Sequence, residues 1–187
     1  MVGEVWGHKV TRDYYFDNGF DALINFDYQD KAQKAAFNMS FTDEIYSEYA
    51  SKICKDPSFN MLSFVSSHDT RLIYTDFSDI GQQKRIANSF TMLPGQIQIY
   101  YGDELARGNV ETILLDQVPR SDMNWSDLEK EDHKNLLSHW QKLLNFRKKH
   151  KAIASGRHIK ISNYPYAFVR VKDDDALIIA SYDSIKE

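Results

Sequence analysis

The chain has 187 residues, of which 42% are hydrophobic and 27% are charged, which is enough for one domain with its own core. The net charge of -4, without a basic stretch longer than a few residues, argues against a nucleic-acid partner. The single cysteine, Cys54, excludes an internal disulfide framework and a multi-cysteine metal site, and no apolar run approaches membrane-spanning length.

The first predicted strand covers residues 1–6, and no cap, turn or tail precedes it in the sequence. Such a start looks wrong for a natural N-terminus. No secretory signal stands at residue 1, which leaves the compartment open, periplasmic or secreted included. The pattern around Glu4 favours an exposed charge on an edge strand over an acid at a strand end, whose pKa burial would raise. A loop through Asn18 and Gly19 is expected to follow.

Strands and helices alternate through the middle of the chain. Short apolar runs bounded by polar residues predict strands, and apolar residues that recur every three to four positions predict helices. Ser126 and Glu129 fit a capping box at the start of the last helix, on which Leu136 and Trp140 share a face. In chain order the expected elements are strand 20–27, helix 31–37, helix 41–53, strand 61–66, helix 81–93, strand 96–101 and a helix that begins after the capping box and ends near His150.

The pattern changes near residues 152–156. Beyond this point the period is two, which is typical of strands with one buried face. Antiparallel strands are predicted at 157–162, 166–172 and 176–181, with a hairpin turn at 173–175. We expect two parts, residues 1–152 and residues 153–187.

Residues 60–70 form the stretch around which the rest is organised. An apolar run ends in small hydroxyl residues and then in His68 and Asp69. A short apolar run of this kind is typical of a strand buried in a parallel sheet. Because ligands and catalytic groups lie at the carboxyl ends of such strands, His68 and Asp69 are candidate site residues.

Strands that alternate with helices predict parallel βα units joined by right-handed crossovers. Four such units fall short of a closed eight-stranded barrel, which needs about 200 residues or more. An open doubly wound sheet is the alternative on pattern alone. The sequence has no Gly-x-Gly-x-x-Gly and no phosphate loop, which weakens a nucleotide-binding function.

Five segments, taken in order, resemble the second half of the catalytic barrel in the α-amylase family of glycoside hydrolases. Gly3–Trp6 is similar to the segment at the fifth barrel strand, and Phe64–Asp69 is similar to the segment at the seventh. Ile99–Glu104 resembles the eighth strand and its following loop. Arg120–Trp125 resembles an Arg-x-x-Met-x-Trp motif, and Phe146–His150 resembles the end of the last barrel helix.

The resemblance implies the C-terminal half of a TIM (β/α)8 barrel, strands five to eight, in residues 1–152. Residues 153–187 then resemble the start of a truncated antiparallel C-terminal β domain. It also implies a retaining glycoside hydrolase that cleaves α-1,4-glucosidic bonds in starch and maltooligosaccharides.

By this resemblance Glu4 is the general acid/base. Asp69 is the third carboxylate, which grips sugar hydroxyls and stabilises the distorted transition state, and His68 donates a hydrogen bond to a sugar hydroxyl. The physical requirement agrees, because glycoside hydrolysis needs one carboxyl to protonate the leaving oxygen and another to stabilise or attack the oxocarbenium-like centre.

Further residues are candidates for sugar binding. His8 lies in the loop after Glu4 and is assigned to a neighbouring subsite, with a structural role an even alternative. Trp6 is expected to stack on a sugar face, whereas core packing is favoured for Trp125. Tyr101 is also a candidate, although Tyr100 and Tyr101 alternate in a strand and packing suits both of them.

The resemblance places the family's nucleophile, an Asp on the fourth strand, outside this sequence, and so implies that the chain is a fragment. We therefore expect the isolated chain to be inactive on starch. The expected substrate is an α-glucan or maltooligosaccharide, and neither a nucleic acid nor a membrane is an expected partner. Self-association through open barrel edges is also expected. No cofactor and no metal are implied in this chain, and calcium belongs to the full-length enzyme.

Other functions share these motifs. α-1,6-Glucosidases, sucrose-cleaving enzymes and transglycosylases of the family are alternatives, as is a non-catalytic carbohydrate-binding barrel. An unrelated open-sheet binding domain is a third class. The intact pair Glu4 and Asp69 argues against a silent relative, which has no chemical need for either.

Overall fold

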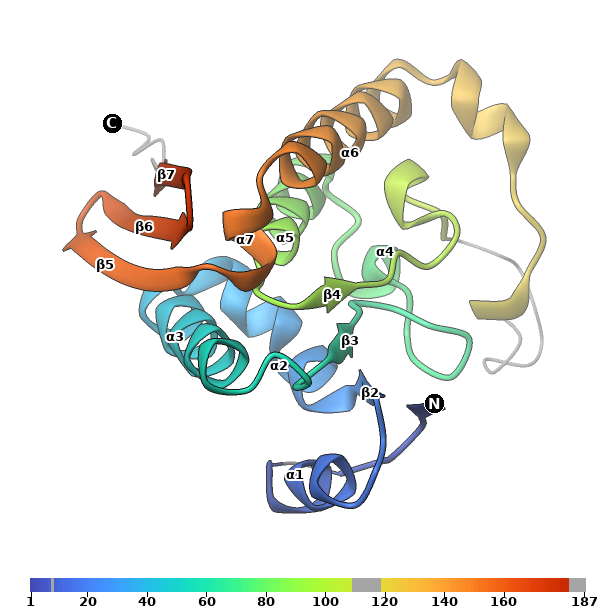
Figure 1. Cartoon of the computed structure of the whole chain (residues 1–187). Helices are drawn as coiled ribbons and strands as arrows, with labels where there is room; N and C mark the ends of the chain where they lie inside the picture. Colours follow the sequence, from blue (N-terminus) through green and yellow to red (C-terminus); the bar gives the residue numbers. More distant parts are fainter. Residues whose placement is uncertain (8, 109–118, 182–187) are drawn as a thin grey trace.

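A computed structural model describes residues 1–7, 9–108 and 119–181 (Figure 1). A parallel sheet has the order β1-β2-β3-β4, and an antiparallel sheet has the order β5-β6-β7. The strands are β1 (Val2–Gly3), β2 (Ala22–Asn25), β3 (Met61–Ser63), β4 (Gln96–Ile97), β5 (Arg157–Asn163), β6 (Tyr166–Lys172) and β7 (Asp175–Ser181). The helices are α1 (Lys9–Asp17), α2 (Phe26–Phe37), α3 (Met39–Lys55), α4 (Ile73–Asp76), α5 (Ile80–Thr91), α6 (Glu131–Lys149) and α7 (Lys151–Ser155), with 3-10 turns η1 (Asp103–Leu105) and η3 (Trp125–Glu129).

The parallel strands bring the loops that follow them to one edge of the sheet. Gly3 pairs with Leu23, Leu23 with Met61, and Leu62 with Gln96, so the carboxyl ends of all these strands point the same way. We call the segments that leave them, residues 4–7, 64–70 and 98–107, the carboxyl edge. In Figure 1 the segments that follow β3 and β4 extend to the right of the sheet.

The core lies between the parallel sheet and the helices that cover it. Helix α5 packs against α2 and α6. Phe90 and Trp140 are almost fully buried there, with ring centroids 6.2 Å apart. The sequence pattern predicted helices at these places. The burial of Ile86 and Phe90 on α5, and of Leu93 just after its end, confirms the predicted apolar face.

Helix α1 corrects the expectation of a loop through Asn18. Its inner face carries Phe16, which contacts Phe59 with ring centroids 4.8 Å apart, and the buried Arg12. A buried arginine and aromatic rings stand where aliphatic residues would have given the usual helical signal. The predicted loop was therefore wrong over Lys9–Asp17.

The parallel strands are also shorter than expected. β3 ends at Ser63 rather than at residue 66, and β4 ends at Ile97 rather than at residue 101. Beyond these ends the Gln98 N–H still donates to the Ser63 carbonyl at 2.7 Å, and the Ser66 hydroxyl donates to the Asp103 carboxylate. The apolar run continues past β3 because Phe64 and Val65 are also buried, whereas residues 98–101 beyond β4 are partly or fully exposed.

The predicted capping box is wrong. The segment 126–129 forms part of the 3-10 turn η3, and α6 begins only at Glu131. Its N-cap is Lys130, which makes no side-chain capping bond. Asn124 and Lys130 instead bind the carboxylate of Asp127, which is buried in this turn.

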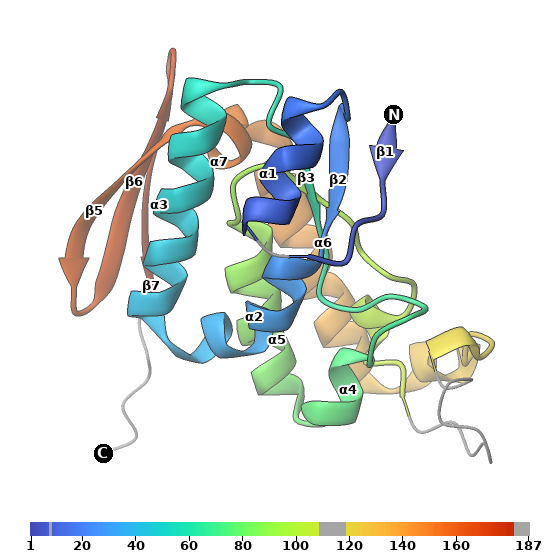
Figure 2. The ribbon, with the colours of Figure 1, turned by 90° about the horizontal axis from the view of Figure 1, so that it is seen from below.

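The antiparallel sheet confirms the predicted strands after residue 156, and its β6–β7 turn lies where the hairpin was expected. It packs beside α3 and α7, as Figure 2 shows. At this contact the Asp43 carboxylate of α3 accepts bonds from His158 Nε2 at 2.9 Å and the Tyr166 hydroxyl at 3.0 Å. Lys160 lies 3.2 Å from its second oxygen.

Behind this contact lies Arg170, whose side chain is fully buried. Its Nε donates to His158 Nδ1 at 2.9 Å, and its Nη1 donates to the Ile153 carbonyl at 2.7 Å. Because Nδ1 accepts from Arg170, the proton of His158 resides on Nε2, which faces Asp43. Burial lowers the pKa of His158, which agrees with a neutral imidazole in this place.

Candidate active site

Glu4 lies one residue beyond β1 and is exposed at the carboxyl edge. Its carboxylate accepts a bond from Trp6 Nε1 at 3.2 Å. The indole of Trp6 stacks on Phe26 with ring centroids 3.9 Å apart and an interplanar angle of 23°. Phe26 in turn meets Phe64 edge to face at 5.3 Å, so one aromatic row crosses the exits of β1, β2 and β3.

His68 and Asp69 lie in the loop that leaves β3. His68 Nε2 is 3.1 Å from Asp69 Oδ2, and the two side chains are 58% and 33% exposed. The other carboxylate oxygen, Oδ1, is 2.5 Å from Arg120 Nη2. Both oxygens of Asp69 therefore have a basic partner, one from its own loop and one from the segment that precedes η3.

The loop that carries Asp69 is a tight turn. Ser67 N donates to Thr70 Oγ1 at 2.8 Å, and Asp69 N donates to Ser67 Oγ at 3.2 Å. Small hydroxyl residues make such turns by binding their own backbone. The hydroxyl residues before His68 in the sequence thus shape the turn, and Asp69 is fixed relative to Ser67.

A second turn, residues 102–107, follows β4. Gly102 has φ of +92°, and a Cβ there would lie 2.5 Å from the Arg107 side chain, so only glycine fits. The buried guanidinium of Arg107 donates to the Ser121 hydroxyl at 2.7 Å, to the Pro119 carbonyl at 3.1 Å and to the Tyr101 carbonyl at 3.0 Å. This turn therefore holds the segment that delivers Arg120 to Asp69.

Tyr101 is 41% exposed, yet much of it is committed to the protein. Its hydroxyl donates to the Ser121 carbonyl at 2.6 Å, and Arg107 Cζ lies 4.0 Å from its ring centroid. These contacts suit a packing role, and sugar binding by Tyr101 stays a prediction.

Other predicted residues lie as follows. His8 falls outside the described residues. Trp6 is 63% exposed, so its face opposite Phe26 is open to solvent. Trp125 is 68% exposed, which corrects the expectation of core packing. It opens the 3-10 turn η3, whose buried member is Asp127.

Three residues that sequence reasoning left without a role take part in this edge: Arg120, Asp103 and Arg107. Arg120 stands in the Arg-x-x-Met-x-Trp motif, and Asp103 follows a glycine directly after an apolar run. These signals identified the two segments as similar to family motifs. They did not reveal the contact between Arg120 and Asp69, because 51 residues separate the two.

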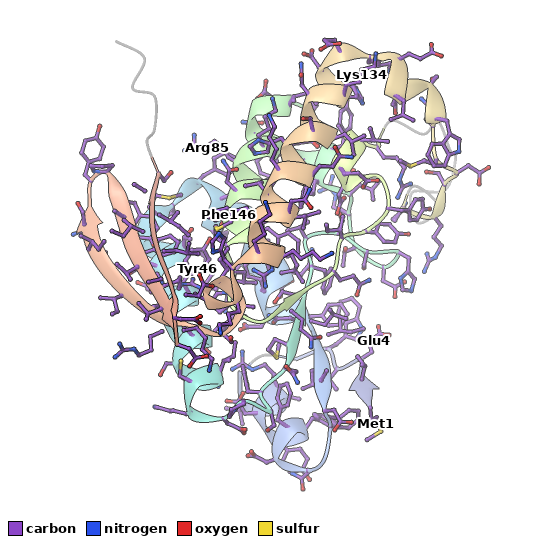
Figure 3. The ribbon with its side chains drawn as sticks, turned by 45° about the horizontal axis from the view of Figure 1, so that its top comes forward. Met1, Glu4, Tyr46, Arg85, Lys134 and Phe146 are labelled. Atoms are coloured by element: carbon purple, nitrogen blue, oxygen red, sulfur yellow. The ribbon has the colours of Figure 1, made fainter. Side chains whose placement is uncertain are left out.

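A cleft of about 550 Å³ lies elsewhere, between the helices and the antiparallel sheet. Tyr46, Arg85 and Phe146 line it, and Figure 3 shows Glu4 on the opposite side of the molecule. The described lining of the cleft holds no Asp, Glu or His. The described lining of this cleft therefore offers no pair of carboxyl groups for glycoside hydrolysis.

Within the described ranges, His, Cys, Asp and Glu side chains form no group of three or more that could hold a metal ion. In the same part of the chain, no helix has the length and apolar character needed to cross a membrane.

Comparison with known proteins decides the family. The model of the alpha amylase catalytic domain matches residues 1–134. The chain belongs to the alpha-amylase catalytic-domain family. Over 182 residues, this family member is 40% identical to a periplasmic alpha-amylase of Escherichia coli K12, covering 96% of this chain and 25% of that protein. It is also 31% identical over 166 residues to a cyclomaltodextrinase of Geobacillus thermopakistaniensis, covering 83% and 26% of the two chains.

Solved structures show the same fold for this family member. The alpha-amylase from H. orenii aligns with a TM-score of 0.71 and 24% identity over 95% of this chain and 42% of that chain. An alpha-amylase from Geobacillus thermoleovorans, complexed with acarbose, aligns with a TM-score of 0.74 and 19% identity over 96% and 40%. The chain thus spans from a quarter to less than half of the length of these similar proteins.

Proposed function

We propose that this chain is part of a retaining glycoside hydrolase that acts on α-1,4-linked glucans, and that its parallel strands are the fifth to eighth of the family barrel. The observation that carries the proposal is that Glu4 and the His68–Asp69 pair leave strands of one parallel sheet at the same edge. A sugar ring at this edge would be within reach of an acid from one strand and a carboxylate from another.

Glu4 suits the role of general acid/base. Its exposure leaves the carboxyl accessible to a glycosidic oxygen, and the bond from Trp6 Nε1 orients it. A general acid must come within hydrogen-bond reach of the oxygen that it protonates, about 2.6–3.2 Å. In the second half of a retaining reaction the same carboxylate takes a proton from the attacking water.

Asp69 and His68 suit the role of gripping sugar hydroxyls. Charged acceptors and donors bind hydroxyl groups more strongly than neutral ones. The nucleophile comes from a segment outside this sequence, so this chain alone lacks the covalent route.

The test is titration of the chain with maltotriose, with the β-linked cellotriose as the comparison sugar. We expect saturable heat with maltotriose only, and no release of glucose. Asp69→Ala should lower the maltotriose affinity about tenfold, because a charged hydrogen bond is lost. The matched variant Asp132→Ala, an exposed carboxylate on α6, should bind like the parent chain. Equal heat with both sugars would contradict an α-glucan site, and glucose release would contradict an external nucleophile.

The two edges of the parallel sheet carry a second proposal, that the chain self-associates through them. Within the described residues β1 pairs with β2 alone and β4 with β3 alone. Met1 and Val2 at the β1 edge are 68% and 60% exposed. Exposed strand edges pair readily with another chain, and an edge lysine prevents it.

We therefore expect light scattering to report dimers or larger species that dissociate on dilution, and Val2→Lys to shift the chain to monomer. Val10→Lys is the matched control, since Val10 is 84% exposed on α1 and away from the sheet. A parent chain that stays monomeric at every concentration, or equal effects of the two lysines, would argue against pairing through β1.

A further inference from the structure

Asp103 is buried beneath the carboxyl edge and has no part in the proposed chemistry. The residue is 4% exposed, and its Oδ1 accepts a bond from the hydroxyl of Ser66, which is fully buried. Its other oxygen, Oδ2, is also buried and has no hydrogen-bond partner within the described part of the chain. A carboxyl with one oxygen unsatisfied is costly to bury in the charged form.

Ser66 connects this carboxyl to the candidate site. It precedes the tight turn in which Ser67 binds Thr70 and the Asp69 backbone. Anchoring Ser66 therefore sets where the turn begins, and His68 and Asp69 follow from it. The same 102–107 turn that supplies Asp103 also supplies Arg107, which holds the segment of Arg120 on the far side of Asp69.

We propose that Asp103 is a positioning residue, which sets the placement of His68 and Asp69 through its bond to Ser66 and changes that placement when it ionises. This inference rests on the proposed function only in naming the sugar that the loop binds. The connection from Asp103 to the loop stands on the hydrogen bond between two buried side chains.

The groups around Asp103 determine when it ionises. Its pKa is raised to about 7, mainly by burial and also by the nearby charge of Glu104, against the opposing effects of the Ser66 hydroxyl and the Arg107 charge. Helix α6 also packs against this turn. Its His133 Nδ1 lies 2.6 Å from the Leu105 carbonyl. Below about pH 7 the carboxyl is neutral and its burial costs little, whereas above it a buried charge depends on Ser66.

The first measurement needs no sugar. In a chain with His68→Gln, which removes the titration of the imidazole, the amide signals of Ser66 and Asp69 are followed by NMR from about pH 5 to about pH 9. We expect a shift with a midpoint near neutral pH, in step with the Asp103 carboxyl carbon. The shift should be absent when Asp103→Asn is added, and Asp132→Asn should leave it unchanged.

The second measurement is the pH profile of maltotriose affinity in chains that keep His68. Asp103→Asn keeps the shape of the carboxyl and an acceptor for Ser66. We therefore expect its maltotriose affinity to match that of the parent below neutral pH, and to lack the change in affinity that the parent shows above neutral pH. Asp103→Ala and Ser66→Ala should each weaken binding about tenfold throughout, because the loop loses its anchor. Urea unfolding of each variant shows that the chain remains folded.

The outcomes separate the two proposals. If the parent binds no maltotriose but the amide shift follows Asp103, the positioning role holds and the sugar site fails. If maltotriose binds and the Asp103→Asn chain keeps the parent's pH profile and amide shift, the positioning role is overturned while the sugar site stands.

Discussion

Replacing Arg12 by alanine is expected to lower the free energy of unfolding by about 3–5 kcal/mol, the largest single effect that we foresee. The guanidinium is 3% exposed and lies 3.3 Å from Asp27, which is 2% exposed. It also lies 2.9 Å from Asp13 and 3.2 Å from Glu48, and thereby joins α1 to α2 and α3. Its removal takes one cation away from the buried carboxylate of Asp27, which keeps its ion pair with the partly exposed Lys31 at 2.6 Å.

Urea unfolding measures this loss, and two further chains identify its cause. Arg71→Ala removes an arginine that is 70% exposed and pairs with Asp76, so it should cost less than about 1 kcal/mol. In an Asp27→Asn background, Arg12→Ala should cost clearly less than in the parent, because no buried charge is left behind. Equal costs in both backgrounds would show that packing on Phe59, and not the ion pair, carries the effect.

Replacing Asp43 by alanine is expected to cost about 3 kcal/mol, the second largest effect. This carboxylate accepts from His158 and Tyr166 and lies beside Lys160, so one side chain of α3 holds both β5 and β6. Without it, the buried N–H of His158 and the hydroxyl of Tyr166 lose their acceptor. Buried donors without partners cost about 1–3 kcal/mol each.

Glu44→Ala provides the matched control for this change. Glu44 is the next residue on α3 and is exposed, so the same charge is removed from the same helix without breaking the contact. The difference between the two urea midpoints, at equal slope, measures the contribution of the contact. If both variants unfold at the same midpoint, Asp43 does not join α3 to the antiparallel sheet.

Much of the fold was predictable because its signals are local. Trp140 and Leu136 recur on one face of α6, and strict alternation marks β5 to β7, so both kinds of element were expected where they occur. Helix α1 was not predicted, since Arg12 and its aromatic neighbours do not give an aliphatic pattern. The start of α6 was misplaced because Asp127 binds Lys130 and Asn124, a tertiary choice that a capping motif cannot reveal.

The residues of the candidate site were more predictable from the sequence than the hydrogen bonds that hold them. Glu4, His68 and Asp69 follow apolar runs, and the rule that parallel strands present their carboxyl ends together places them at one edge. The bonds from Arg120 to Asp69 and from Ser66 to Asp103 span 51 and 37 residues. Such contacts depend on the paths of two loops, and no periodic pattern in either loop specifies them.

The ion pair between Arg120 and Asp69 has a thermodynamic consequence for any guest at this position. Each carboxylate oxygen has two lone pairs, so a glucose hydroxyl can bind Asp69 beside Arg120 without displacing it. Because Arg120 already holds the carboxylate in place, the hydroxyl binds an acceptor whose side-chain entropy is already reduced. Recognition at this carboxylate therefore depends on how well the hydroxyl geometry of the guest matches the acceptor positions that Arg120 leaves open.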